Sequence, residues 1–241
     1  MLLADRVAIE AAAAAATQPR DFVSALNSPG LGVIAEIKRR SPSAGPIAPD
    51  LDPLELSRAY RRGGAVALSV LTEPDHFGGS LGDLGIVTDD TALPVLRKDF
   101  IIDPIQLDEA RATGADAVLL ITAILEDAVL EELIGRTATL GMAALVETHD
   151  GDEVRRAVDA GASIIGINNR DLKTFQVDLG TSVRLRSAIP SGVAAVAESG
   201  IRSPADVSRM RDSGFDAVLV GQAAAQADDA TDFLTLLVGT P

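Results

Sequence analysis

Cysteine and tryptophan are absent from the 241 residues, and histidine occurs only twice, at His76 and His149. Without cysteine the chain has no disulfide bond, no thiolate nucleophile and no cysteine-ligated metal, and nothing indicates an oxidising compartment. Neither histidine has a partner at zinc-ligand spacing, so no metal site is expected. Gly-x-Gly-x-x-Gly, Walker and Gly-x-Ser-x-Gly sequences are missing too. We therefore expect a cytoplasmic protein that uses no metal, nucleotide cofactor or serine nucleophile.

Long apolar runs and basic stretches are also missing. The alanines of residues 11–16 follow Asp5, Arg6 and Glu10, which interrupt any membrane span or secretion signal and favour a helix. The chain carries 21 Lys+Arg against 35 Asp+Glu, a net charge of −14, so nucleic acid is not an expected partner. With 47% hydrophobic residues the chain can bury a large core.

An internal repeat indicates the fold. Gly64, Gly114, Gly161 and Gly214 lie about 50 residues apart, and each precedes a short apolar run. Such a glycine ends a helix, and such a run is typical of a strand buried on both faces. With the apolar runs between the repeats, eight strands are expected. They are 32–37, 66–71, 94–96, 117–121, 142–146, 164–167, 193–197 and 217–220.

Helical patterns alternate with these strands, at residues 53–62, 104–113, 126–140, 151–160 and 203–213. Eight alternations predict an α/β fold, a (β/α)8 TIM barrel, although an open doubly wound sheet has the same alternation. The fourfold period favours the barrel. We expect one barrel domain over residues 1–241, within which residues 1–31 form a short N-terminal helical extension.

Polar residues end five of the eight strands. In this fold the carboxyl ends of the strands meet at one mouth, where the chemistry takes place. Glu36 and Lys38 are two residues apart and share a face of their strand. Any one such residue could simply mark the point where a strand reaches solvent. Their coincidence predicts a cluster of three cations and three carboxylates suited to proton transfer: Lys38, Lys98 and Arg170 facing Glu36, Glu147 and Glu198.

Glycine-containing turns after the last two strands indicate a phosphate site. Gly200 and Gly221 stand where barrels often bind phosphate through backbone amides, and the turn 40–45 adds hydroxyl groups nearby. Phe77, Phe100 and Phe175 fall in loops just beyond strand ends, where each either fills the core or lines an aromatic pocket.

These residues together resemble one enzyme family. The segments Glu36-Ile37-Lys38 with Ser41-Pro42-Ser43, Arg97-Lys98-Asp99-Phe100, Asn169-Arg170-Asp171-Leu172 and Glu198-Ser199-Gly200 are similar, in order, to those of indole-3-glycerol-phosphate synthases of tryptophan biosynthesis. The resemblance implies a cofactor-free carbon–carbon lyase. Its reaction closes the indole ring of a phosphorylated, anthranilate-derived substrate, 1-(2-carboxyphenylamino)-1-deoxyribulose 5-phosphate, and releases carbon dioxide and water.

The resemblance also implies roles for residues. Lys98 is expected to be the general acid and Glu147 its partner in proton transfer; Lys38 holds the substrate carboxylate and is the second candidate for the acid. The supporting set comprises Glu36 (positioning Lys38), Asn168, Arg170 and Ser199 (orienting the carboxylate and hydroxyls), Glu198 (supporting that network), Leu119, Ile121, Phe77 and Phe100 (gripping the benzene ring), and Ser41, Gly200 and Gly221 (binding phosphate). A monomer is expected on the same ground.

Two departures from the family pattern stand out. The N-terminal extension, which in the family caps the barrel mouth, is short here and has no aromatic residue before Phe22. Gln222 replaces the usual serine or glutamate, so the phosphate site depends on where its amide points. The alternatives are a phosphoribosylanthranilate isomerase, a Schiff-base aldolase using Lys98, and a barrel that only binds an anionic metabolite or a partner; the last is disfavoured because both lysines and all three glutamates are present.

Overall fold

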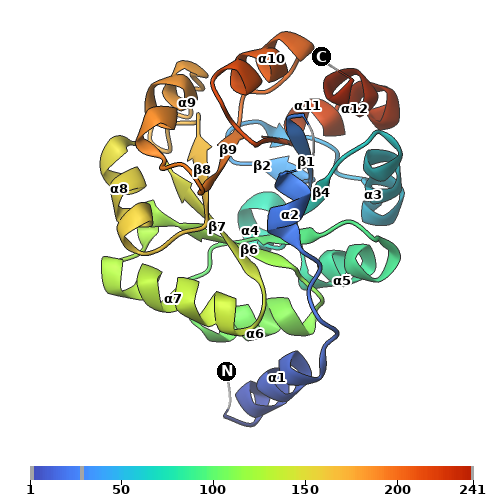
Figure 1. The fold of residues 1–241 in the computed structure, drawn as a ribbon. Coiled ribbons are helices and arrows are strands. Elements are labelled where there is room, and N and C mark those ends of the chain that lie inside the picture. Colours follow the sequence, from blue (N-terminus) through green and yellow to red (C-terminus); the bar gives the residue numbers. More distant parts are fainter. Residues whose placement is uncertain (1–2, 28–29, 240–241) are drawn as a thin grey trace.

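The computed structural model describes residues 3–27 and 30–239, in which eight parallel strands close into a barrel (Figure 1). The strands are β1 (Gly32–Ile37), β4 (Ala67–Leu71), β5 (Val95–Lys98), β6 (Ala117–Ile121), β7 (Ala143–Thr148), β8 (Ile164–Asn168), β9 (Ala194–Glu198) and β10 (Ala217–Val220). Each pairs with its neighbours in chain order, and β10 pairs with β1. The predicted (β/α)8 barrel is therefore confirmed, and the open sheet is excluded because that last pairing closes the ring.

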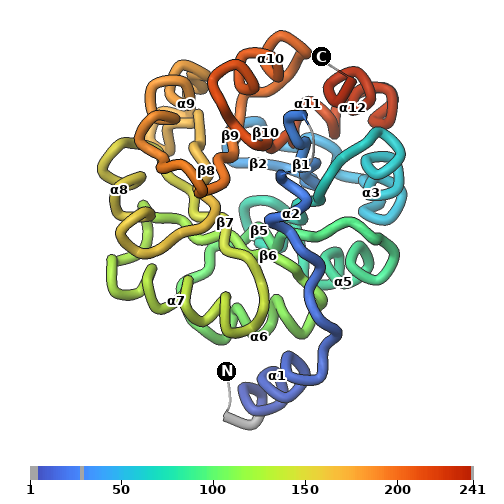
Figure 2. Tube along the Cα trace, viewed as in Figure 1, coloured from blue at the N-terminus to red at the C-terminus, as the bar shows by residue number. Residues whose placement is uncertain are grey.

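A ring of helices surrounds the strands, as the tube view also shows (Figure 2). The helices that follow the barrel strands are α3 (Pro53–Arg62), α5 (Leu81–Asp90), α6 (Ile105–Ala112), α7 (Asp127–Thr139), α8 (Gly151–Asp159), α9 (Gly180–Leu185), α10 (Pro204–Asp212) and α12 (Ala230–Val238). Short elements lie in the connections: the hairpin β2 (Arg40–Ser41) and β3 (Gly45–Pro46), helices α4 (Pro74–Phe77) and α11 (Gln222–Ala225), and 3-10 turns η1 (Thr122–Ile124) and η2 (Arg186–Ala188). Phe77 thus lies in a one-turn helix rather than a loop.

The strands carrying the polar ends run further than expected. Strands β5, β8 and β9 include Lys98, Asn168 and Glu198, whereas the apolar runs stop before them. Backbone pairing does not depend on the side chain, so these residues stay in the ladder; Leu71 pairs with Lys98, and Asn168 with Glu198. Lys98, Asn168 and Glu198 therefore sit at the ends of strands rather than on loops.

Alternation along each strand separates two apolar layers. Side chains of one parity, such as Ile34, Leu96 and Leu119, fill the barrel interior, while their neighbours pack against the outer helices. The inward parity continues from Ile34 to Glu36 and from Leu96 to Lys98, so apolar side chains fill the lower barrel and ionisable ones emerge at its carboxyl end.

Two helices precede the barrel, one at its side and one across its end (Figure 1). Helix α1 (Leu3–Ala15) packs beside α6, and α2 (Phe22–Leu26) lies across the amino-terminal end of the barrel (Figure 1). Phe22 and Leu26 of α2 are buried against the interior layer that contains Ile34. No helix of the described residues is long and apolar enough to cross a membrane. Helix α2 therefore covers the amino-terminal end of the barrel, opposite the polar ends of the strands.

Candidate functional site

The carboxyl ends of the barrel strands enclose a pocket of about 550 Å³. Fifteen of the sixteen predicted site residues line it: Glu36, Lys38, Ser41, Phe77, Lys98, Phe100, Leu119, Ile121, Glu147, Asn168, Arg170, Ser199, Gly200, Gly221 and Gln222. Glu198 lies just beneath, fully buried, with its carboxylate on Lys98. No described residue of the segment 3–27 contributes to the lining. The structure thus brings the predicted site together around one cavity.

Lys98 is the centre of the charged cluster. Its Nζ lies 2.6 Å from Glu198 Oε2, 3.5 Å from Glu36 Oε2 and 3.8 Å from Glu147 Oε2. Burial disfavours the ammonium, but the three carboxylates outweigh burial and raise the pKa of Lys98. Lys98 is therefore held as an ammonium ion. That state suits a general acid and opposes a Schiff-base aldolase, which needs a neutral amine.

Lys38 and Glu36 form a second pair on the same face of β1. Nζ of Lys38 donates a short hydrogen bond to Glu36 Oε1. Burial favours the neutral acid, yet Lys38 and Lys98 outweigh it and lower the pKa of Glu36. Tyr60 supports the strand from outside, because its hydroxyl donates to the carbonyl oxygen of Glu36 at 3.2 Å. Glu36 therefore connects the two lysines at the floor of the pocket.

Arg170 departs from the predicted six-membered cluster. Its Nη1 donates to the carbonyl oxygen of Phe175 at 3.1 Å, and within residues 3–27 and 30–239 it has no carboxylate partner at ion-pair distance. Burial and the nearby Arg202 lower the pKa of Arg170, with Glu36 opposing them. Arg170 comes from the loop after β8 rather than from the strand, which carries it toward the rim. Of the three predicted cations, Lys38 and Lys98 form ion pairs with these glutamates in the described part of the chain, and Arg170 does not.

The remaining two glutamates differ in their partners. His149 lies 3.4 Å from Glu147, and Lys98 is the only cation within ion-pair distance of Glu198 among the described residues. Burial alone would raise the pKa of Glu147, but His149 and Lys98 lower it to about 2. Burial raises the pKa of Glu198 to about 7, with Lys98 opposing and Glu147 and Glu36 contributing. Glu147 is thus held as a carboxylate at neutral pH, whereas Glu198 is the glutamate of the cluster that takes up a proton most readily.

Ser199 has a left-handed backbone, with φ 64°, which non-glycine residues rarely adopt. The turn is held from below by Asn169, whose side-chain amide donates to the carbonyl oxygens of Glu198 and Ser199 at 3.0 and 3.1 Å. Asn169 is buried and points away from the pocket, unlike its neighbour Asn168. The strained turn after β9 therefore directs Ser199 and Gly200 into the cavity.

An aromatic pair forms one wall of the pocket. The ring centroids of Phe77 and Phe100 are 6.2 Å apart, and Leu119 and Ile121 lie below on β6. Phe175, left open as core or pocket, lines the cavity and is 46% exposed. These side chains make an apolar wall next to the charged cluster.

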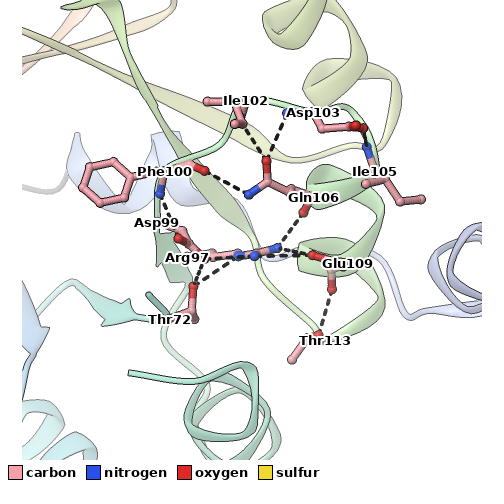
Figure 3. A network of polar contacts seen from close by, with 10 residues as sticks. All are labelled: Thr72, Arg97, Asp99, Phe100, Ile102, Asp103, Ile105, Gln106, Glu109 and Thr113. Carbon is pink, nitrogen blue, oxygen red and sulfur yellow. Dashed lines mark hydrogen bonds and ion pairs between the residues drawn. The ribbon is translucent and has the colours of Figure 1, made fainter. Parts of the chain in front are cut away.

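A buried network holds the loop that carries Phe100 (Figure 3). The guanidinium of Arg97 points out of the barrel and donates to Thr72 Oγ1, Asp99 Oδ2 and the carbonyl oxygen of Gln106. The side chain of Gln106 in turn accepts from the amide of Ile102 and donates to the carbonyl oxygen of Phe100, at 2.8 and 2.9 Å. Hydrogen bonds to Gln106 of α6 thereby hold the loop after Lys98 in place, although the loop itself is exposed.

The other side of the mouth gathers anion-binding groups. Arg170, Arg202, Ser41 and Gly200 all line it. Gln222 also lines it, but its amide nitrogen donates to Gln226 Oε1 at 3.3 Å along α11. A side chain at Gly221 would collide with Glu36, since an added Cβ would lie 2.3 Å from its Oε1. Gly221 therefore also serves close packing against the charged cluster.

Several lining residues were not singled out from the sequence, notably Glu73, Ile124, Leu172, Arg202 and Gln226. For Arg202 a signal was present: it is a cation two residues after Gly200, in the turn predicted to hold phosphate. Ile124, Leu172 and Gln226 come from connections whose path no pattern predicts. Within residues 3–27 and 30–239, no group of three or more histidine, aspartate or glutamate side chains is placed to hold a metal ion.

Known solved structures share the fold at low identity. A thiamine phosphate pyrophosphorylase from Pyrococcus furiosus is 17% identical with a TM-score of 0.64, over 88% of this chain and 95% of that one. An N-acetylmannosamine-6-phosphate 2-epimerase from Clostridium perfringens is 16% identical with a TM-score of 0.64, over 86% of this chain and 93% of that one. At this identity the likeness supports the barrel fold alone.

Sequence relatives are much closer. Proteins named indole-3-glycerol phosphate synthase from Mycobacteroides abscessus and Mycobacterium ulcerans are each 51% identical, over 93% and 92% of this chain and 83% and 81% of theirs. The family model described as indole-3-glycerol phosphate synthase matches residues 3–237. With the match running through the whole barrel and the site residues gathered at its mouth, the chain belongs to the indole-3-glycerol phosphate synthase family.

Proposed function

We propose that the pocket at the barrel mouth is where this enzyme, a decarboxylating ring-closing lyase of tryptophan biosynthesis, performs its reaction. The substrate is 1-(2-carboxyphenylamino)-1-deoxyribulose 5-phosphate, and the products are indole-3-glycerol phosphate, carbon dioxide and water. The observation that carries the proposal is the position of Lys98: a buried ammonium ion surrounded by three glutamates, between an apolar wall and a group of anion-binding residues.

Lys98 acts as the general acid in this proposal. The aromatic carbon that bears the carboxylate attacks the ketone carbon, and the carbonyl oxygen becomes a hydroxyl group as it takes a proton from Lys98. The bond to the carboxylate then breaks, carbon dioxide leaves, and its electron pair restores the aromatic ring. A positioned ammonium lowers the barrier where negative charge develops on oxygen.

Dehydration completes the indole. The new hydroxyl group leaves as water with a proton from a lysine, and Glu147 takes the proton lost from the five-membered ring. Glu147 suits this role because His149 and Lys98 hold its pKa at about 2, so that it is ionised throughout the neutral range. Glu198 supports the cycle by sharing a proton with Lys98, at 2.6 Å.

Lys38 binds the substrate carboxylate and is the second candidate for the acid. Glu36 fixes the position of Lys38 through their hydrogen bond. Asn168, Arg170 and Ser199 surround the same region of the pocket and supply donors to the carboxylate and hydroxyl groups. Arg170 is suited to the anion because no protein carboxylate among the described residues lies within ion-pair distance of it.

The apolar wall binds the benzene ring of the substrate. Phe77, Phe100, Leu119 and Ile121 line one side of the pocket and are held by the helix α4, the loop network of Arg97 and the strand β6. The two rings are tilted by 52° with centroids 6.2 Å apart, which leaves both ring faces able to pack on a flat ligand.

The opposite rim binds the phosphate. Ser41, Gly200, Gly221 and Gln222 line the pocket there, which supports this assignment, and Arg202 adds a cation close enough to Arg170 to lower its pKa. Two cations that repel each other are each stabilised by an anion placed between them. A phosphate bound at Arg202 therefore reduces the repulsion that Arg202 exerts on Arg170, while Arg170 itself is directed to the substrate carboxylate.

The whole chain acts as one barrel domain in this proposal, with residues 1–31 as its N-terminal extension. A net charge of −14 opposes close self-association, which supports a monomer, and the absence of cysteine suits the cytoplasm. Light scattering at several protein concentrations tests the monomer, and a single calorimetric transition tests the single domain.

Product formation gives the direct test of the function. The chain has no tryptophan, so the indole fluorescence of the product rises over a weak protein signal. We expect turnover by the wild type in chelator-containing buffer and a loss of about 100-fold or more in kcat for Lys98→Ala. Lys38→Ala is expected to raise KM, because it removes the carboxylate contact. A folded wild type that makes no product from this substrate would contradict the proposal.

A further inference from the structure

His149 occupies a position that the mechanism above leaves unexplained. It lies between the end of β7 and the start of α8, and its side chain is only 14% exposed. The backbone amide and Nδ1 of His149 both contact Glu153 Oε2, at 2.8 and 3.0 Å. On the other side, Nε2 lies 3.4 Å from Glu147 Oε1. The ring is thus clamped between two carboxylates, one on α8 and one in the pocket.

The two oxygens of Glu147 have different partners. Oε1 faces His149 and Oε2 faces Nζ of Lys98, at 3.4 and 3.8 Å. Nε2 of His149 is buried and has no hydrogen-bond partner in the described part of the chain, so this carboxylate is its one ion-pair contact there. A carboxylate anchored at one oxygen cannot rotate freely. The contact with His149 therefore fixes the orientation of the Glu147 carboxylate, with one oxygen on the imidazole and the other toward the pocket.

We propose that His149 is a positioning residue for ring closure, which holds Oε1 of Glu147 so that Oε2 faces Lys98 and the substrate. Glu153 serves as the second anchor and orients the imidazole ring. This inference rests on the proposed role of Glu147 in proton transfer. It adds a chain of contacts from Glu153 through His149 to Glu147, which begins on the outer helix α8 and ends at the reacting groups.

Charge supports the same arrangement. Burial disfavours the imidazolium, but Glu147 and Glu153 outweigh burial and raise the pKa of His149 to about 10. Lys98 and the side chain of Asn168 are the other groups that lower the pKa of Glu147. His149 is therefore held as a cation at neutral pH, the state in which its contact with the Glu147 carboxylate is attractive.

A second cation distinguishes the three glutamates around Lys98. Glu36 has Lys38, Glu147 has His149, and Glu198 has no cation but Lys98 among the described residues. The first two stay ionised, while the pKa of Glu198 is raised to about 7. His149 thus assigns Glu147 to the role of base and leaves Glu198 as the group that exchanges its proton with Lys98.

The first test reads the ionisation of His149 without any turnover. The chain has two histidines, so nuclear magnetic resonance of histidine-labelled protein gives two sets of imidazole signals, and His76→Asn assigns them. We expect His149 to remain an imidazolium from pH 5.5 to 8.5, and to lose its proton at lower pH in Glu147→Gln. A neutral His149 at pH 7, or a titration that Glu147→Gln leaves unchanged, overturns the proposal.

The second test uses kinetics. His149→Asn is expected to lower kcat by about 10-fold with little change in KM, and to move the acidic limb of the pH profile of kcat to higher pH, since Glu147 loses a neighbouring cation. Glu153→Gln, which keeps the shape of the side chain, is expected to shift the limb in the same direction by less. If His149→Asn does not fold, Glu153→Gln still tests whether the orientation of the imidazole ring affects the pH profile.

The matched control is Asp150→Ala. Asp150 caps α8 by accepting from the amide of Glu153 at 2.9 Å, and within residues 3–27 and 30–239 it forms no hydrogen bond or ion pair with Glu147 or His149, so its loss disturbs the start of the helix and leaves both side chains in place. If Asp150→Ala reproduces the pH shift of His149→Asn, or if His149→Asn keeps the wild-type profile, His149 has only a structural role. A fully active Glu147→Gln instead contradicts the proposed function of Glu147, and the positioning role fails with it.

Discussion

Glu198 Oε2 accepts a hydrogen bond of 2.6 Å from Nζ of Lys98, while Oε1 of the same carboxyl group is buried without a hydrogen-bond partner in the described part of the chain. The group is packed against β8, since a Cβ added to Gly166 would lie 2.2 Å from Oε1. Burial and two neighbouring glutamates raise the pKa of Glu198 to about 7 against the attraction of Lys98. The pair is therefore held together by packing as well as by charge.

Glu198→Gln is expected to flatten the dependence of stability on pH. The pKa of Glu198 is about 7 in the folded chain and near 4.5 when unfolded, so between these values the folded state binds the extra proton. Its contribution to the free energy of unfolding is therefore complete below about pH 4.5 and is lost as pH rises through 7. Urea unfolding at pH 5, 6, 7 and 8 measures this.

The difference between wild type and variant isolates Glu198 from other titrating groups. We expect the variant to gain stability relative to the wild type on going from pH 5 to pH 8. A difference that stays constant over that range contradicts the raised pKa.

Gly166→Ala is expected to reduce kcat strongly while the chain still folds. The added methyl group meets Glu198 Oε1 at 2.2 Å, so the carboxyl group must move and its contact with Lys98 is disturbed. We expect a loss of about 10-fold or more in kcat, because small displacements of catalytic groups are costly. The fluorescence assay measures the loss, and circular dichroism checks the fold.

Gly135→Ala provides the matched control. Gly135 lies in α7, and an added Cβ meets nothing within 4 Å. Alanine is favoured over glycine inside a helix, so stability is expected to rise by about 1 kcal/mol with unchanged kinetics. Equal kinetic effects of the two substitutions would show that Gly166 has no special relation to Glu198.

The charged cluster was predictable because strand geometry is regular. Side chains alternate along a strand, so Glu36 and Lys38 had to share a face, and the carboxyl ends of barrel strands meet, so Lys98, Glu147 and Glu198 had to converge. The roles that the family resemblance implies were predicted from motif similarity, without any argument from strand geometry. Four of the five charged residues, Glu36, Lys98, Glu147 and Glu198, belong to the strand ladder, and Lys38 follows directly after β1.

Residues in the connections were harder to predict. Arg170 was expected to face the glutamates, but its loop places it at the rim of the pocket. Gln222 was expected to contribute to the phosphate site, and its side-chain amide contacts Gln226. The contact of His149 with Glu153 depends on where α8 begins relative to β7. Such relations are set by tertiary packing, which no spacing along the chain records.

Arg20→Met is expected to destabilise the chain without impairing catalysis. Arg20 links the N-terminal segment to the closed end of the barrel: its guanidinium donates to the carbonyl oxygens of Thr91 and Leu93 at 2.5 and 3.0 Å and pairs with the buried Asp116 at 3.1 Å. Its loss leaves Asp116 with no ion-pair partner among the described residues and only the longer-range attraction of Arg111, so we expect the free energy of unfolding to fall by about 3 kcal/mol.

Arg6→Met removes a comparable bond from the surface. Arg6 pairs with Asp103 at 2.9 Å, but both side chains are more than 40% exposed, so the expected loss is below about 1 kcal/mol. Urea unfolding compares the two variants. A similar loss for both contradicts the anchoring role of Arg20, and a changed kcat for Arg20→Met contradicts its separation from the pocket.

Arg202→Met is expected to raise KM about 10-fold with little effect on kcat. Arg202 lines the rim next to Gly200 and acts on Arg170 by repulsion, so a bound phosphate stabilises both cations before and during the reaction alike. Removing an interaction that is equal in the ground and transition states changes KM and leaves kcat. The same substitution is expected to weaken the dependence of KM on salt concentration, because one cation fewer faces the anion.

Arg209→Met is the matched control, since it removes an equal charge from the exposed face of α10, outside the pocket lining. Steady-state kinetics at 0.05 and 0.3 M salt distinguish these cases. An effect of equal size in Arg209→Met would show that the change in KM comes from net charge alone. A fall in kcat at constant KM would contradict a role in phosphate binding and indicate that Arg202 acts in the reaction itself.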